Sequence, residues 1–94
     1  MKIYISGKVT DNDFAEESFK AAEDLMKAKY NATVINPYKV CRELPVLEHS
    51  EYMKICFALM DICDAVYFIE DWMESCGASQ EMGYAIAKGM KIYF

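Results

Sequence analysis

The residues best suited to chemistry lie near the C-terminus, in the stretch ESCGASQEMGYA at positions 74–85. Glu81 follows a run of small residues and lies about one turn into a segment with helical spacing. Unpaired backbone N–H groups and the partial positive charge at a helix start favour an anion, either a bound phosphate or an ionised carboxylate. Glu81 is therefore a candidate nucleophile, and the Ser75 hydroxyl is a candidate ligand contact at the same place.

The same spacing also has a purely structural explanation. Ser75 would cap the helix, and Glu81 would be solvated near the positive helix end, which is favourable by itself. Gly7 and Gly77 leave room for a ligand beside the backbone, but neither belongs to a G-x-G-x-x-G or phosphate-loop pattern. Spacing alone favours the structural explanation.

Length and charge limit the possible functions. The 94 residues predict a single domain, residues 1–94, with one hydrophobic core. A net charge of −5 argues against binding a nucleic-acid polymer, because such proteins need clustered Lys and Arg to displace phosphate counterions. A single nucleoside or nucleotide remains possible, since a few backbone donors can hold it.

Cysteine and histidine usage gives no sign of a metal site. The only histidine is His49, and the four cysteines form no C-x-x-C pair: Cys41, Cys56, Cys63 and Cys76. We expect no metal and no cofactor, and the spacing of Cys56 and Cys63 on one helical face is the usual pattern of small buried thiols in a reducing compartment. No apolar stretch is long enough for a signal peptide or a membrane span, so we predict a cytoplasmic protein with no membrane partner.

Strand and helix patterns alternate along the chain. Apolar or alternating stretches predict strands at residues 2–5, 32–37, 64–69 and 91–94, and helical spacing predicts helices over 13–30, 50–63 and 78–89. Residues 38–48 show no clear period and read as a long loop. This order predicts an α/β fold of three layers, flavodoxin- or Rossmann-like, with a four-stranded parallel sheet in the order 2-1-3-4.

In such a sheet, ligands bind beyond the carboxyl ends of the strands where the winding reverses, here between the first and third strands. The turn SGKV, with Ser6 and Gly7, should then lie beside the loop EDWMESCGAS, with Asp71, Ser75 and Gly77. Glu81 would face the same crevice. We take this group as the candidate site.

Several of these stretches resemble a known family: YISGKV, INP and CDAVYFIEDWMESCGASQEMGYAIAKG. They are similar to DUF4406, small domains of unknown function in the nucleoside 2-deoxyribosyltransferase superfamily. The most specific part is S-x-G-x-x-x-E-x-G-x-A, from Ser75 to Ala85. The resemblance implies that Glu81 is the nucleophile that attacks the anomeric carbon of a (deoxy)ribose. It also implies that Gly7 lies along the ligand and that Ser75 binds a 5′-phosphate, as in the hydrolase branch.

This chemistry is hydrolysis of a nucleoside or nucleotide N-glycosidic bond, or deoxyribosyl transfer, through a glycosyl ester. One implied residue is absent, because the aspartate expected eight residues before Asp64 is Cys56. Asp71, Glu70 or Glu74 could replace it, although solvated surface charge is the simpler explanation for each. Two other functions stay open: a non-catalytic nucleotide or sugar-phosphate binding module, and an interaction domain with a vestigial pocket.

The helical segment of residues 50–63 predicts an assembly. Residues 55–60 are consecutively apolar, so a strip that includes Phe57 or Met60 should remain after the helix packs on the sheet. A second copy of the chain would cover this strip, which predicts a homodimer or higher homo-oligomer. Alternatively, the long loop of residues 38–48 folds back and covers it.

Overall fold

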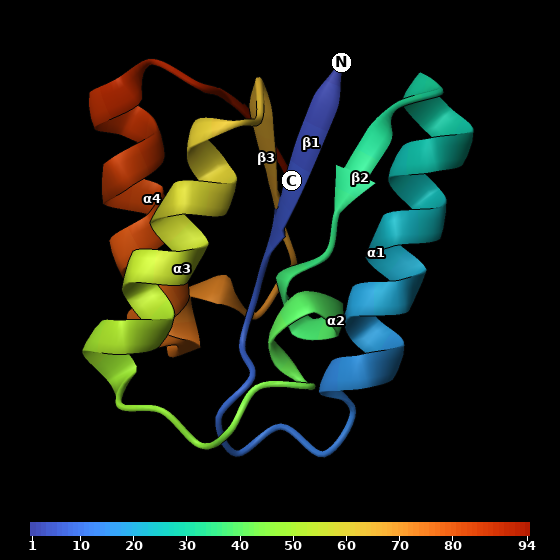
Figure 1. Cartoon of the computed structure of the whole chain (residues 1–94). Coiled ribbons are helices and arrows are strands. Elements are labelled where there is room, and N and C mark those ends of the chain that lie inside the picture. Colours follow the sequence, from blue (N-terminus) through green and yellow to red (C-terminus); the bar gives the residue numbers. More distant parts are fainter.

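A four-stranded parallel sheet forms the centre of the chain in a computed structural model that describes all 94 residues (Figure 1). The strands are β1 (Lys2–Ser6), β2 (Thr33–Ile35), β3 (Ala65–Phe68) and β4 (Lys91–Tyr93). Their order is β2-β1-β3-β4, and each neighbouring pair is parallel. The predicted α/β fold and the strand order 2-1-3-4 are confirmed.

Helices cover both faces of this sheet, so the chain has three layers (Figure 1). They are α1 (Ala15–Tyr30), α2 (Pro37–Cys41), α3 (His49–Asp61) and α4 (Cys76–Lys88), with a short 3-10 helix, η1 (Trp72–Glu74), before α4. Phe19 and Met26 of α1 pack on one face, and Met60 of α3 and Ala85 of α4 pack on the other. None of these helices has the length and apolar character needed to cross a membrane.

Strand β1 lies in the middle of the sheet and is buried on both faces. Successive side chains of a strand point to opposite faces. Ile3 and Ile5 accordingly join the core under α1, whereas Tyr4 joins the core under α3 and α4. Ser6 shares the face of Tyr4 and is only 1% exposed. A buried hydroxyl at this position needs a hydrogen-bond partner on the α3 and α4 side.

Helix starts differ from the predicted ones by one or two residues. α1 begins at Ala15, and Asp13 does not cap it, since the cap position is Phe14. α3 begins at His49 because Glu48 and Glu51 form a reciprocal capping box. α4 begins at Cys76, two residues before the predicted start.

The prediction of a loop over residues 38–48 is wrong at its beginning, where the chain forms α2. Pro37 takes the first helical position, where its missing N–H costs no hydrogen bond. The Asn36 side chain caps the helix by accepting a hydrogen bond from the backbone N–H of Lys39 at 3.3 Å. Five residues make less than two turns, so no helical period is visible in the sequence.

The apolar strip expected on α3 is partly covered within the chain. Met60 is fully buried in the core, so the expectation that it could remain outside is wrong. Phe57 is half-buried, and its ring stacks on Tyr84 of α4 at a centroid distance of 4.3 Å. The cover of Phe57 therefore comes from Tyr84 of α4.

Candidate active site

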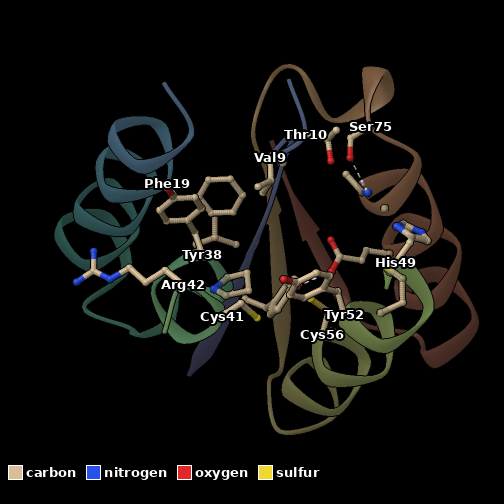
Figure 2. A pocket seen from close by; sticks show the side chains of 18 residues that line it. Val9, Thr10, Phe19, Tyr38, Cys41, Arg42, His49, Tyr52, Cys56 and Ser75 are labelled. Carbon is tan, nitrogen blue, oxygen red and sulfur yellow. Dashed lines mark hydrogen bonds between the residues drawn. The ribbon is translucent and has the colours of Figure 1, made fainter. Parts of the chain in front are cut away.

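A pocket of about 500 Å³ lies at the carboxyl end of β1, between the two helical layers (Figure 2). Its lining comes from β1, the loop that follows β1 and the helices α1 to α4. Four of the predicted site residues line it: Gly7, Ser75, Gly77 and Glu81. The sheet thus brings the first strand and the start of α4 to one cavity.

Glu81 is the central polar residue of this pocket. It projects from α4 toward β1 and is only 5% exposed. Ser6 Oγ donates a hydrogen bond to Glu81 Oε1 at 2.6 Å, and the Tyr4 hydroxyl donates a short hydrogen bond to Glu81 Oε2. The structural explanation of Glu81 as a solvated helix-start residue is therefore wrong. Ser6 does not line the pocket itself, so it acts by holding the Glu81 carboxylate in place.

Burial sets the electrostatics of this carboxyl group. Loss of solvent raises the pKa of Glu81, and the hydrogen bonds from Ser6 and Tyr4 oppose that rise only in part. Burial together with the adjacent Glu81 also raises the pKa of Tyr4 well above its usual value. The Tyr4 phenol therefore stays protonated as a donor, and both carboxylate oxygens are held in one orientation.

Ser75 has the structural role that its position suggests. Its Oγ accepts a hydrogen bond from the backbone N–H of Ala78 at 3.1 Å and so caps α4. It also lines the pocket, so the cap does not exclude contact with a ligand. Gly77 borders the same part of the cavity, where a Cβ would lie 3.7 Å from the His49 ring and 3.9 Å from Ser75 Oγ.

Packing against Ile69 leaves no room for a side chain at Gly7. A Cβ at this position would lie 2.9 Å from Ile69 Cδ1 and 3.1 Å from Ile69 Cβ, closer than side chains normally approach. The backbone N–H of Ile69 donates to the Ser6 carbonyl at 2.8 Å and holds the two segments together. Space for a ligand is thus only one of two explanations for this glycine.

Asp71 lies outside the pocket lining. Its carboxylate accepts a hydrogen bond from the backbone N–H of Lys8 at 3.3 Å, and Lys8 Nζ lies 3.6 Å from Glu74. These contacts show that the loops after β1 and β3 lie side by side, as the sequence predicts. In this arrangement Asp71 positions the loop after β1.

Cys56 lies on α3 in the pocket lining, at the position where the family resemblance implies an aspartate. Burial, together with the nearby Glu81 charge, raises the pKa of its thiol to about 12, so the thiol stays protonated at neutral pH. Glu81 is then the only carboxylate that lines the pocket. No group of three or more His, Cys, Asp or Glu side chains is arranged to hold a metal ion.

Sequence reasoning missed two parts of the lining. His49 borders the pocket, and its Nε2 lies 3.0 Å from Gln80 Oε1 of α4. It is the only histidine of the chain, and this was the one feature of the sequence that could have pointed to it. The other part is α2, which contributes Pro37, Tyr38 and Cys41. No signal marked these residues, because the segment showed no period.

Comparisons with known proteins agree with this architecture. The family model described as "Domain of unknown function (DUF4406)" matches residues 1–94. The structure is similar to a 2-desoxiribosyltransferase from Leishmania mexicana, with a TM-score of 0.70 and 24% sequence identity. The likeness covers 97% of this chain and 61% of the other, and it shows a shared fold. A search of curated proteins finds no match.

Proposed function

The chain belongs to the DUF4406 family, and we propose that it cleaves the N-glycosidic bond of a nucleoside or nucleotide, by hydrolysis or deoxyribosyl transfer. The observation that carries this proposal is Glu81, a buried carboxylate in a 500 Å³ pocket with both oxygens held by hydroxyl donors. The fold shared with a 2-desoxiribosyltransferase supports the same class of reaction.

In the proposed reaction, one Glu81 oxygen attacks the anomeric carbon and the bond from that carbon to the base nitrogen breaks. The base leaves with the bonding electrons and takes up a proton. A glycosyl ester of Glu81 remains until water, or a second base, attacks the same carbon and releases the carboxylate. Two successive displacements give net retention of configuration. Since no other carboxylate lines the pocket, we assign the proton to solvent.

Ser75 and His49 lie on one side of the pocket (Figure 2), and we propose that this side receives the 5′ group of the sugar. The Ser75 oxygen already accepts from Ala78, yet its O–H remains able to donate to a phosphate oxygen. The start of α4 also favours an anion. Nucleoside 5′-monophosphates should therefore bind more tightly than the corresponding nucleosides.

The test is to incubate the protein with nucleosides and their 5′-monophosphates and to measure free base by chromatography. Base release should disappear in Glu81→Gln and Glu81→Ala. It should persist in Ser79→Ala, which changes an exposed residue of the same helix. Release that survives in Glu81→Gln would refute the assigned nucleophile. Calorimetry that finds equal or weaker binding of the monophosphates would refute the role of Ser75.

One observation favours a second candidate, a non-catalytic nucleotide or sugar-phosphate binding module. Cys56 leaves the pocket without a second carboxylate to protonate the departing base. Such a module would show thermal stabilisation without base release, by about 2.7 kcal/mol at a ligand concentration of a hundred times Kd. An interaction domain would show neither thermal stabilisation nor base release.

The cytoplasmic location of the protein also stays a prediction.

A further inference from the structure

The two sides of the pocket differ in chemistry. Phe19 and Tyr38 lie on one side, and His49 and Ser75 lie on the other (Figure 2). The Phe19 and Tyr38 rings are in contact, with centroids 5.9 Å apart and planes inclined by 31°. Tyr38 is half-buried and borders the cavity, so part of its ring remains available to a ligand. The side with Phe19 and Tyr38 thus presents aromatic rings, beside Arg42, whose guanidinium pairs with Glu16, whereas His49 and Ser75 give the other side polar groups.

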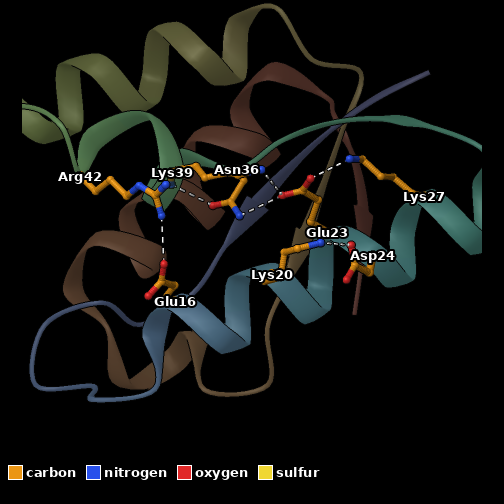
Figure 3. A network of polar contacts seen from close by, with 8 residues as sticks. All are labelled: Glu16, Lys20, Glu23, Asp24, Lys27, Asn36, Lys39 and Arg42. Atoms are coloured by element: carbon orange, nitrogen blue, oxygen red, sulfur yellow. Dashed lines mark hydrogen bonds and ion pairs between the residues drawn. The ribbon is translucent and has the colours of Figure 1, made fainter.

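The element that carries Tyr38 cannot hold its position alone, because a five-residue helix is unstable in isolation. A buried polar cluster fixes it to α1 (Figure 3). Glu23 Oε1 accepts a hydrogen bond from Asn36 Nδ2 at 3.1 Å, while Asn36 Oδ1 accepts from the backbone N–H of Lys39 and caps α2. The cap residue of α2 is therefore itself held by a carboxylate of α1.

Glu23 is unusual for a surface helix, since its side chain is only 5% exposed. The sequence places Glu23 and Lys27 one turn apart, as an ion pair typical of an exposed helix face. The pair is present at 2.7 Å, but its carboxylate end is buried. The hydrogen bond from Lys27 lowers the pKa of Glu23, and Lys39 Nζ lies 3.8 Å away. The carboxylate stays ionised and can keep its bond to Asn36.

We propose that α2 recognises the planar base of the substrate, with Tyr38 as the contact and with Glu23 and Asn36 as positioning residues. The substrate class rests on the proposed function. A nucleotide has an aromatic base at one end, a 5′ group at the other and the anomeric carbon between them. The pocket offers a group suited to each part: the Tyr38 ring lies on one side and Ser75 on the other (Figure 2), and the Glu81 carboxylate lines the same cavity. Stacking on a tyrosine ring favours a base whatever its hydrogen-bonding edge.

The first test measures binding by calorimetry in the Glu81→Gln protein, so that no turnover interferes. The probes are 2′-deoxynucleoside 5′-monophosphates and 2-deoxyribose 5-phosphate, which has no base. Tyr38→Leu should weaken nucleotide binding about tenfold and leave binding of the sugar phosphate unchanged. Tyr38→Phe should retain the parent affinity. The proposal would be overturned if Tyr38→Leu left nucleotide binding unchanged. It would also be overturned if the Glu81→Gln protein with Tyr38 intact bound no nucleotide.

The second test concerns position. Glu23→Gln should weaken nucleotide binding severalfold without affecting the sugar phosphate, because α2 loses its fixed position. The matched control is Asp24→Asn, which removes the neighbouring exposed pair with Lys20 and should change neither affinity. Equal loss for both probes would mean that Glu23 only stabilises the fold and would overturn its positioning role. Where Glu23→Gln does not fold, as judged by circular dichroism, the Tyr38 variants decide the proposal.

These outcomes are separable from those of the proposed function. Nucleotide binding that depends on Tyr38, with no base release by the parent chain, would refute the reaction and retain the recognition element. Base release that depends on Glu81, with a KM for the nucleotide that Tyr38→Leu leaves unchanged, would support the reaction and refute the role of Tyr38 in base recognition.

Discussion

Ser6 Oγ donates to Glu81 Oε1 at 2.6 Å, which joins the central strand to the last helix inside the pocket. Tyr4, two residues earlier on the same face of β1, donates to the other oxygen. One strand therefore carries both donors of the carboxylate. Each donor can be removed separately without changing the shape of the strand.

Replacing Tyr4 by phenylalanine removes one donor and keeps the ring. The pKa of Glu81 should rise further, because the hydrogen bond from Tyr4 lowers it. We expect base release to fall roughly ten- to hundredfold, the equivalent of about 1.5–3 kcal/mol for a hydrogen bond to a charged group. Base release should rise with pH as Glu81 loses its proton, and in Tyr4→Phe this rise should occur at a higher pH. Tyr84→Phe, which loses an exposed bond to Asp61, is the control. An unchanged pH profile in Tyr4→Phe would contradict this role.

Glu81 should make stability depend on pH. Its pKa is raised in the folded chain, so the folded state binds more protons than the unfolded state between the ordinary and the raised pKa. Unfolding free energy therefore falls as pH increases through this range. Glu81→Gln should stabilise the chain at neutral pH, and the gain should shrink below the ordinary carboxyl pKa. Urea unfolding at several pH values measures this difference, and a gain independent of pH would argue against it.

Two glycines give opposite predictions for the same substitution. Gly7→Ala places a methyl group 2.9 Å from Ile69 Cδ1 and should cost about 1–3 kcal/mol of unfolding free energy. Gly83→Ala lies in α4 with no heavy atom within 4 Å of the new Cβ, and it should stabilise by about 0.5–1 kcal/mol. Chemical denaturation of both variants decides the matter. Equal effects would show that the end of β1 adjusts to a side chain.

The homodimer stays a prediction, and the structure changes how it should be tested. Phe57→Glu would also break the stacking on Tyr84, so it should lower stability as well as split a dimer. Ile86 on α4 is 64% exposed, so Ile86→Glu is a control that introduces the same charge with little effect on the fold. Light scattering at micromolar concentration should give a dimer mass for the parent. A monomeric parent would refute the prediction.

The fold was predictable because apolar or alternating stretches mark the strands and helical spacing marks the long helices, and alternation of the two permits few topologies. The surroundings of Glu81 could not be predicted from the sequence. Its donor Tyr4 is 77 residues away and reads as an ordinary strand aromatic. Asn36 likewise reads as the end of a strand, whereas it caps α2 and is held by Glu23. Local patterns predict elements, but side-chain partners depend on packing between distant segments.

The central position of β1 also bears on the order of events during synthesis. Its partner β2 follows soon after it, whereas β3 is made only after α3, and such distant pairing is slow. Until then β1 has one unpaired edge, which can attract other chains. Tyr4 and Ser6 gain their acceptor only when α4 docks. The candidate site should thus be among the last parts to form, and a chain released before α4 would have both donors but no carboxylate between them.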